Sequence, residues 1–371
     1  MFDFIKREVR AYPELDTIRF ISVTLVVCHH LFFQSGMFLS WAHDYAWVGV
    51  DIFFTLSGFL ITGILIKEIE KNGKIDFKNF ILKRIIRLWP CWLIALLLSF
   101  SLTYAFASKN LDIMHDLKTK FIYYILHFGN YSHAFSGKLH TLFSHFWSLA
   151  VEEHFYLIWP ATMAIVYKFK GLKKTVLFSL VLLPYLFRVM HHYLGWDQAS
   201  ITLSTHTRID SIVWGCILAF VFNKIKDLTT LQEIFQTILM FALFFISLHY
   251  ISRNEAISPW ISELGRTTLA WSTCLLIIIS LKGSKKGLRR VLSNPILSWL
   301  GIMSYGVYLF HVHTNVVLFA LVKKYAPTMN ETSIALLSNI LPYGPAIITF
   351  YLIDKKLNGK RSAIIAKIRG V

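Results

Sequence analysis

Hydrophobic runs long enough to cross a lipid bilayer recur from one end of the chain to the other. A transmembrane helix needs about 20 predominantly apolar residues to cross a hydrocarbon core about 30 Å thick. With 55% hydrophobic residues and a mean hydropathy of +0.54, the 371-residue chain is too apolar for a soluble protein. The pattern predicts an all-α integral membrane protein, with residues 1–371 forming a single transmembrane domain. The ten predicted helices are centred on residues 16–36, 46–66, 88–108, 145–167, 173–192, 205–223, 232–250, 263–281, 295–321 and 333–354.

The lysines and arginines predict the orientation of these helices. In the ten-helix arrangement, the termini and the loops after even-numbered helices carry 27 of the 38 basic residues, and the loops after odd-numbered helices carry 7. Basic residues concentrate on the cytoplasmic side of membrane proteins, so both termini are predicted to be cytoplasmic, with a short basic segment at 1–15 and a basic tail at 355–371. The formal net charge of +17 is explained by contact with anionic membrane lipids and requires no nucleic-acid partner.

The cysteines and the paired histidines do not have the spacing of a disulfide framework or a metal site. The four cysteines all lie inside predicted helices and form no C-x-x-C pair. His311 and His313 are two residues apart, so on a helix they point about 200° away from each other and cannot chelate one ion together. The sequence therefore predicts no metal ion.

The first hydrophobic segment places ionisable side chains at membrane depth. Arg19 and His30 are eleven residues apart, which puts them within roughly 20° of one helical face and about 16 Å apart along the axis. Ionisable groups at that depth are costly unless they have partners or line a cavity, so they mark a candidate functional site. His29 is rotated about 100° from His30 and is predicted to be a helix-packing residue.

Carboxylates at the outer ends of two other segments are candidate partners for these residues. Asp51 is predicted at a depth similar to His30, where its carboxylate could accept a proton from the imidazole and fix its tautomer. Alternatively, Asp51 could stabilise the N-terminus of its own helix through the dipole. Glu152 and Glu153 are adjacent at the start of the fourth segment, so at least one of them faces the protein interior, and either could instead reach back toward water.

Arg84 and Arg87 lie in a strongly basic stretch before the third segment. They are three residues apart and therefore share one helical face. Two neighbouring guanidinium groups at a membrane surface can clamp a phosphate in a bidentate manner. Contact with lipid headgroups is the alternative interpretation of such juxtamembrane arginines.

Further polar residues enter the membrane from later segments. Arg208 and Asp210 are two residues apart at the outer end of the sixth segment, so each is expected to bond to a different neighbour. The ninth segment carries Tyr308 near its middle and His311 in its outer half, and Ser57 lies near mid-depth in the second. The tenth segment is interrupted by LPYGP. In the long outer stretch 109–144, the apolar patch 121–128 is too short to span and is expected to be re-entrant or interfacial.

Six stretches of the chain resemble those of the membrane-bound acyltransferase type 3 family, the O-acetyltransferases that modify O-antigens and other surface glycans. They are ELDTIRFISVTLVVCHH, VGVDIFFTLSGFLI, KRIIRLWP, FWSLAVEEHFYLIWP, RIDSIVWGCILA and SYGVYLFH, spread over residues 14–311. The first contains the family's pattern of an arginine, ten residues and a histidine, which selects His30. His154 stands where glutamine is common. Some members continue into a soluble esterase-like domain, and the chain is expected to be a form without it.

The resemblance implies an activity and a location. It implies a multi-pass protein of the bacterial inner membrane that takes an acetyl or other short acyl group from cytoplasmic acetyl-CoA, with no permanently bound cofactor. The acceptor would be a hydroxyl group of a lipid-linked surface glycan such as O-antigen. Arg19, Arg84 and Arg87 would hold the phosphates of the donor at the inner end.

The outer polar residues then form a hypothetical catalytic cluster, which comprises His30, Asp51, Glu153, Arg208, Asp210 and His311. In this hypothesis His30 is the general base, held by Asp51 or Glu153. Arg208 or Tyr308 would stabilise the oxyanion. A covalent acyl-imidazole on His30 is the second variant.

Two other classes of protein are also compatible with polar residues inside the membrane. In a proton-coupled secondary transporter, the intramembrane histidines and aspartates would form a proton relay. The chain lacks the paired broken helices in repeated halves that are typical of such transporters. In a structural or sensory membrane protein, the same residues would only pack helices, and the loss of Arg84 and Arg87 would be tolerated.

Overall fold

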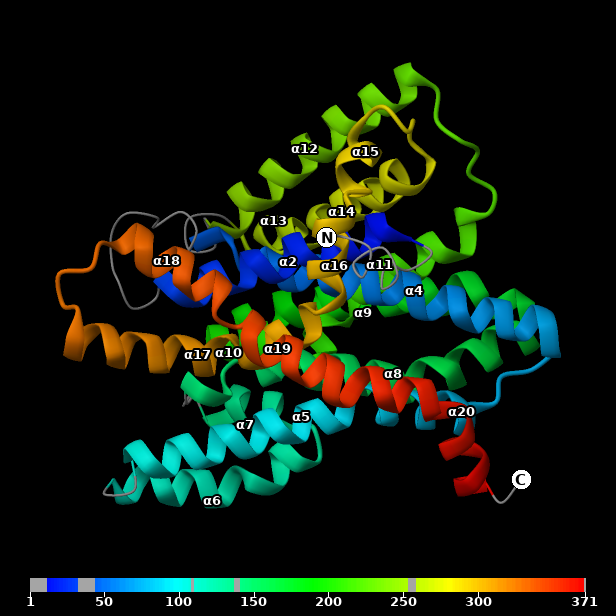
Figure 1. Cartoon of the computed structure of the whole chain (residues 1–371). Coiled ribbons are helices and arrows are strands. Elements are labelled where there is room, and N and C mark those ends of the chain that lie inside the picture. Colours follow the sequence, from blue (N-terminus) through cyan, green and yellow to red (C-terminus); the bar gives the residue numbers. More distant parts are fainter. Residues whose placement is uncertain (1–11, 33–43, 108–109, 137–140, 253–257, 370–371) are drawn as a thin grey trace.

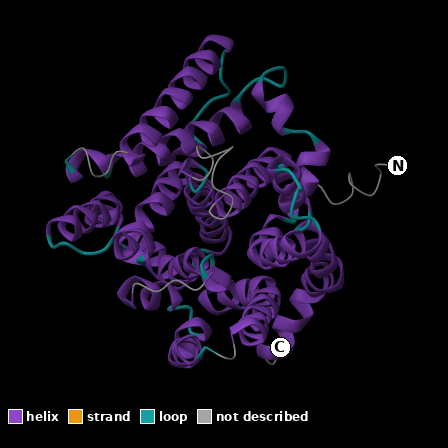
Figure 2. Cartoon of the chain, turned by 90° about the vertical axis from the view of Figure 1, so that its left-hand side faces the viewer, coloured by secondary structure: helices purple, strands orange, loops and turns teal. Residues whose placement is uncertain are grey.

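Helices make up almost all of the structure, which is a computed structural model that describes residues 12–32, 44–107, 110–136, 141–252 and 258–369 (Figure 1). The view down the molecule shows many of these helices nearly along their axes, and the described ranges contain no strand (Figure 2). The predicted all-α class is therefore confirmed. The predicted basic segment 1–15 lies largely outside the described residues.

The long helices and the short helices between them follow one another in chain order. They are α2 (Pro13–Phe32), α4 (Val48–Asn72), α5 (Phe77–Ala107), α6 (Leu111–Ile125), α7 (Gly129–Ser136), η1 (Thr141–Phe143), α8 (Phe146–Lys168), η2 (Lys170–Leu172), α9 (Lys173–Tyr193), α10 (Gln198–Leu203), α11 (Thr205–Phe222), α12 (Thr230–Ser252), α13 (Pro259–Ser262), α14 (Leu264–Lys282), α15 (Leu288–Leu292), α16 (Pro295–Ile302), α17 (Ser304–Tyr325), α18 (Glu331–Ile340), α19 (Tyr343–Thr349), the π-helical turn η3 (Phe350–Asp354) and α20 (Lys355–Arg369).

Each of the ten predicted hydrophobic segments coincides with one or more of these helices. Within the described ranges, seven helical stretches are long and apolar enough to cross a membrane: 48–72, 77–106, 173–193, 230–251, 259–282, 304–325 and 331–368. The other three predicted spans correspond to α2, α8 and α11. These three carry many of the polar side chains that the sequence singled out, and those side chains lower the apolar character of the helices.

Two predicted segments are interrupted. The ninth consists of α16 and α17, which meet at Met303. The tenth is broken at LPYGP as predicted, because α18 ends at Ile340 and α19 begins at Tyr343. Proline lacks the backbone N–H that an uninterrupted helix needs, which accounts for this break.

The described parts of the stretch 109–144, residues 110–136 and 141–144, contain short helices instead of a span. α6 has 15 residues, begins at the cap residue Asn110 and exposes several apolar side chains, among them Phe121 and Ile122. A left-handed His127 (φ 58°) ends it before α7 begins. α6 lies alongside α5 in Figure 1, at the edge of the molecule. An exposed apolar helix of this length is typical of an interfacial element.

One end of the molecule gathers many basic side chains. The last turns of α4, the first turns of α5 and the helix α20 are rich in lysine and arginine. The connection between α4 and α5 and the helix α20 lie toward the right in Figure 1. We call this end the basic end. The connection between α17 and α18 lies toward the left, at what we call the far end.

Glycines at the crossing of α4 and α11 let these helices approach closely. A β-carbon on Gly58 would lie 1.9 Å from the carbonyl oxygen of Ile212. One on Gly215 would lie 1.8 Å from the carbonyl oxygen of Thr55. Thr55 also donates a hydrogen bond to the carbonyl of Ser211 at 3.1 Å. Small residues at such contacts are a main source of helix association in membranes, because burial of apolar surface contributes little there.

Replacing Gly58 by alanine is expected to lower the thermal midpoint of the detergent-solubilised protein. Overpacking costs about 1–3 kcal/mol, and here the obstacle is backbone, which cannot rotate away. Gly63 on the same helix has no atom within 4 Å of the β-carbon position, so Gly63→Ala is the matched control and should be neutral or slightly stabilising. Equal midpoints for the two variants would contradict the close crossing.

Two further glycines allow close packing that fixes the position of α2 along its axis relative to its neighbours α16 and α4. A β-carbon on Gly301 of α16 would lie 1.7 Å from the carbonyl oxygen of Asp16. One on Gly49 would lie 2.4 Å from the carbonyl oxygen of Ser22 and 3.1 Å from a side-chain atom of Val26. The beginning of α4 therefore packs against the middle of α2, and the last two turns of α2 extend beyond it toward the far end.

Candidate functional site

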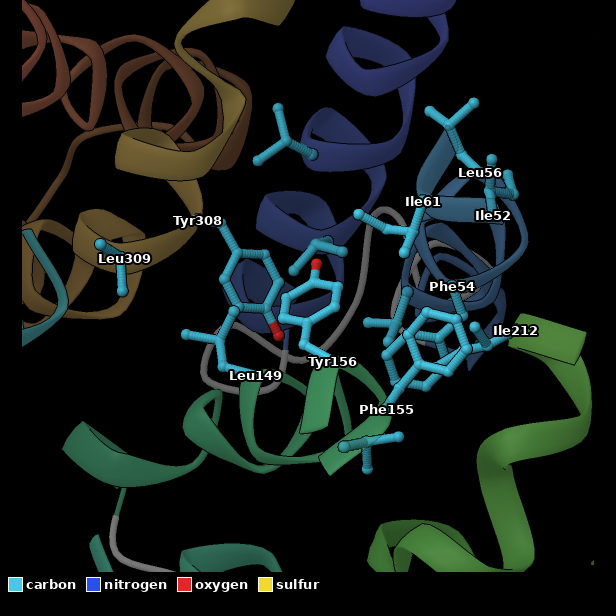
Figure 3. Packing of buried hydrophobic residues seen from close by; sticks show 14 of the residues in the cluster. Ile52, Phe54, Leu56, Ile61, Leu149, Phe155, Tyr156, Ile212, Tyr308 and Leu309 are labelled. Atoms are coloured by element: carbon cyan, nitrogen blue, oxygen red, sulfur yellow. The ribbon is translucent and has the colours of Figure 1, made fainter. Parts of the chain in front are cut away.

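Polar side chains from five helices line one cavity of about 370 Å³ between the basic end and the middle of the molecule. They include Arg19 of α2, Ser57 of α4, Arg84 of α5, Glu152 of α8 and Tyr308 of α17. Apolar side chains fill the spaces between them, and Figure 3 shows part of this packing around Ile61, Leu149, Tyr156 and Tyr308. The cavity thus combines apolar walls with a few polar groups, as small-molecule sites do.

Three guanidinium groups gather at the basic end of the cavity. Arg84 and Arg87 both line it, so they share a helical face as predicted. Arg19 lines it as well and pairs with Asp16 at 2.6 Å. Arg84 makes no ion pair with any described residue; its guanidinium lies 5.5 Å from the ring centre of Tyr156. This end carries more positive than negative charge and suits an anion.

A carboxylate lies midway along the cavity. Glu152 accepts a hydrogen bond from Ser57 at 2.6 Å through one oxygen and from Tyr156 at 3.1 Å through the other. Glu153 does not line the cavity. The hypothesis from the sequence placed Glu153 in the catalytic cluster, whereas the structure brings Glu152 to the cavity. The i, i+4 spacing of Glu152 and Tyr156 is a signal that could have selected Glu152.

Tyr308 closes the cavity toward the far end. Its hydroxyl donates to the carbonyl oxygen of His145 at 3.0 Å and is also hydrogen-bonded to Ser148. Its ring lies edge-on to Phe53 at 6.2 Å. Of the two residues proposed as oxyanion stabilisers, Tyr308 therefore borders the cavity, whereas Arg208 does not.

His30 and His311 meet one helical turn beyond Tyr308. Nε2 of His311 lies 3.3 Å from Nδ1 of His30, and the ring centres are 4.8 Å apart. His311 is fully buried, with the ring of His145 5.3 Å away. Among the described residues, no group of three or more histidine, cysteine or acidic side chains is placed to hold a metal ion. The structure thus brings together two of the predicted catalytic residues.

Asp51 does not hold His30, contrary to expectation. Its two oxygens accept hydrogen bonds from Nη2 of Arg208 at 3.0 and 2.9 Å, and Ser211 donates to one of them at 2.9 Å. The reason is how far α4 is shifted along α2. Gly49 lies opposite Ser22, so Asp51 lies nearer the basic end than His30 does. Asp51 does lie in the first turn of α4, where the alternative placed it, although its carboxylate bonds to side chains of α11.

Asp210 belongs to a separate buried network. Arg188 of α9 donates two hydrogen bonds to its carboxylate at 3.0 and 2.8 Å, and Nε of Arg188 lies 2.7 Å from Glu263. Arg208 and Asp210 thus bond to different neighbours, as predicted from their spacing. Sequence reasoning did not single out Arg188 or Glu263. The predicted outer cluster therefore divides into the histidine pair, the Asp51–Arg208 pair and this network, with Glu153 apart from them.

Replacing Asp210 by asparagine is expected to destabilise the fold by about 3–5 kcal/mol, because two buried arginines, Arg188 and Arg266, would then share the single carboxylate of Glu263. Asp227→Asn is the matched control. Asp227 is exposed and forms a surface ion pair with Lys282 at 3.6 Å, and such pairs contribute little to stability. Thermal unfolding in detergent should show a large drop in midpoint for the first variant and little change for the second. A small drop for Asp210→Asn would show that the network is not a stabilising element.

Fold and site together define a multi-pass membrane protein with a polar cavity, and with a histidine pair one helical turn beyond it in which His311 is buried and His30 partly buried. Residues 12–353 match the acyltransferase domain family, here the type 3 acyltransferases, and the chain belongs to it. It is therefore a membrane acyltransferase.

Several curated proteins are similar to the chain. Peptidoglycan O-acetyltransferase OatA of Listeria monocytogenes is 32% identical over 313 residues, which are 81% of this chain and 48% of the relative. A Staphylococcus aureus protein provisionally named an O-acetyltransferase is 30% identical over 322 residues, or 82% and 51%. YrhL of Bacillus subtilis, provisionally named a peptidoglycan O-acetyltransferase, is 29% identical over 325 residues, or 81% and 48%. The chain spans about half the length of these relatives. No solved structure matches it.

Proposed function

We propose that the protein transfers an acetyl group from cytoplasmic acetyl-CoA to a hydroxyl group of a cell-surface glycan. The names of two relatives support peptidoglycan as the first acceptor to test. A lipid-linked glycan such as O-antigen is the second. The site of action in this proposal is the bacterial inner membrane, with the basic end of the molecule facing the cytoplasm.

The observation that carries the proposal is the charge and shape of the cavity. Three arginines stand at its basic end, and Arg84 among them has no carboxylate partner in the described structure. Coenzyme A carries a pyrophosphate and a further phosphate at one end and its thioester at the other. The guanidinium groups of Arg84 and Arg87 suit those phosphates.

The length of the cavity supports the same donor. Its α4 wall runs from Val50 to Ile64, which spans about 21 Å along the helix axis. That length is comparable to an extended pantetheine arm. Ser57 and Glu152 lie midway, where they can serve the amide groups of that arm as hydrogen-bond partners. The thioester would then lie beside Tyr308, one turn of α17 from the histidine pair.

The proposed reaction is a direct acyl transfer. A lone pair of the acceptor hydroxyl oxygen attacks the thioester carbonyl carbon while His30 takes the hydroxyl proton. The carbon–sulfur bond then breaks, and the thiolate of coenzyme A takes that proton from the imidazolium of His30. Tyr308 is the side chain nearest the thioester that could donate to the oxyanion, if its hydroxyl turns from the His145 carbonyl.

The test is acetyl transfer by the purified full chain in proteoliposomes. Labelled acetyl-CoA would be supplied with peptidoglycan strands or with a lipid-linked O-antigen precursor, and the glycan would be analysed by mass spectrometry. The proposal predicts an acetyl ester on one of these acceptors. If the glycan is labelled when labelled acetyl phosphate is supplied, but not when labelled acetyl-CoA is supplied, the donor assignment is wrong. Esters on neither acceptor, with acetyl-CoA still hydrolysed, would overturn the acceptor class.

A further inference from the structure

The two histidines beyond the cavity are held by backbone carbonyl groups. Nδ1 of His311 lies 2.6 Å from the carbonyl oxygen of Tyr308, and Nδ1 of His30 lies 3.0 Å from that of Val26. A carbonyl oxygen can only accept a hydrogen bond. Each Nδ1 must therefore carry a proton and donate it.

This assignment fixes the contact between the two rings. With its proton on Nδ1, neutral His311 presents the lone pair of Nε2, which lies 3.3 Å from Nδ1 of His30. His30 therefore donates, and His311 accepts. A doubly protonated His311 would force Nδ1 of His30 to be an acceptor, and its lone pair would then face the Val26 oxygen at 3.0 Å.

Resting on the proposed function, we infer that His311 is a positioning residue. Together with the Val26 carbonyl it keeps the proton of His30 on Nδ1, and so makes Nε2 the atom that takes the acceptor proton. In a neutral imidazole, a proton on one nitrogen leaves the lone pair on the other. When Nε2 takes the proton, the imidazolium keeps its donor contact with His311. A buried neutral histidine thus does here what a carboxylate does in a serine–histidine–aspartate triad.

The surroundings explain why an imidazole can serve in this place. Asp51, the carboxylate expected there, is bonded to Arg208 and Ser211 at a different level. His311 is itself held by the backbone of Tyr308, whose side chain borders the cavity. The turn from Tyr308 to His311 therefore connects the end of the proposed donor site with the orientation of the proposed base.

The test compares two replacements of His311 in the full chain. His311→Gln keeps an oxygen that can accept from Nδ1 of His30, whereas His311→Leu keeps similar bulk and offers no acceptor. The inference predicts that His311→Leu lowers kcat for acetyl transfer about 10- to 100-fold with KM for acetyl-CoA within about twofold. His311→Gln should restore most of kcat. If both variants lose kcat to the same extent, and the loss parallels the drop in their thermal midpoints, the role of His311 is merely structural.

A second readout does not depend on activity. Nitrogen-15 NMR of protein labelled in its histidines distinguishes a nitrogen that carries a proton from one with a lone pair, and comparison with His30→Gln assigns the signals of His30. The inference predicts a protonated Nδ1 in the wild type and a mixture of both tautomers in His311→Leu. In that variant only the Val26 carbonyl, which also accepts the helical backbone N–H of His30, still favours the proton on Nδ1. A proton on Nε2 of wild-type His30 would overturn it. If wild-type His30 carries its proton on Nδ1 but the protein transfers no acetyl group, the proposed function is refuted and the inference about the tautomer is not.

Discussion

Replacing His30 by alanine is expected to lower the rate of acetyl transfer by about 10²- to 10⁴-fold, the usual contribution of a general base. The loss should appear in kcat, because His30 does not line the cavity and the proposed donor contacts lie elsewhere. Binding of acetyl-CoA should be unchanged within about twofold. The measurement is the initial rate of ester formation in proteoliposomes, at equal amounts of folded protein.

His29→Ala is the matched control for this variant. His29 is the neighbouring residue of the same type on α2, rotated about 100° from His30, and its ring centre is 5.2 Å from that of His30. It should retain most of the activity. If both variants transfer acetyl groups at wild-type rates, His30 is not the base, whatever the structure places beside it.

Replacing both Arg84 and Arg87 by glutamine is expected to weaken acetyl-CoA binding by about 10²-fold or more. Hydrogen bonds to a charged group contribute about 1.5–3 kcal/mol each, and about 1.4 kcal/mol corresponds to a factor of ten. The effect should appear in KM for acetyl-CoA more than in kcat at saturating donor. Glutamine keeps most of the side-chain volume, so packing against Phe80 and Tyr156 is largely preserved.

The control removes two cations from the same helix without touching the cavity. Lys78 and Lys83 are exposed on α5, and neither lines the cavity. The double replacement Lys78→Gln, Lys83→Gln should leave KM within about twofold. If the two double variants raise KM equally, the arginines act through the general surface charge or lipid headgroups, and the cavity is not the phosphate site.

The architecture could be predicted from the sequence because it follows from local patterns. The length of the apolar runs predicts the helices, and the proline and glycine of LPYGP predict the break between α18 and α19. The three-residue spacing of Arg84 and Arg87 predicts that they share one helical face. The charge bias of the loops also agrees with a basic end at which the α4–α5 connection and α20 lie. All of these features depend on residues close together in the chain.

The partners of the polar residues could not be predicted in the same way. The hydrophobic pattern predicts Asp51 beside His30, because it places these residues at similar depths on consecutive antiparallel helices. In the structure, Gly49 lets α4 pack against the middle of α2, and this shift moves Asp51 away from His30 to Arg208. Such a shift depends on contacts between helices, and the spacing of hydrophobic residues along the sequence does not reveal it.

The choice between Glu152 and Glu153 shows a second limit of local patterns. Neighbouring residues on a helix point about 100° apart, so the rotation of α8 decides which of them faces the cavity. That rotation is set by contacts such as the hydrogen bond of Glu152 with Ser57. The pairing of Arg188 with Asp210 and Glu263 likewise joins segments that are far apart in the sequence.

Sided membrane vesicles test the central claim most directly, namely that the donor enters from the basic end and its acetyl group leaves toward the far end. Labelled acetyl-CoA would be added outside inside-out vesicles and outside right-side-out vesicles that contain the protein and its acceptor. The account predicts label on the glycan only in inside-out vesicles, where the basic end faces the added donor. Equal labelling of the glycan in both preparations would contradict it.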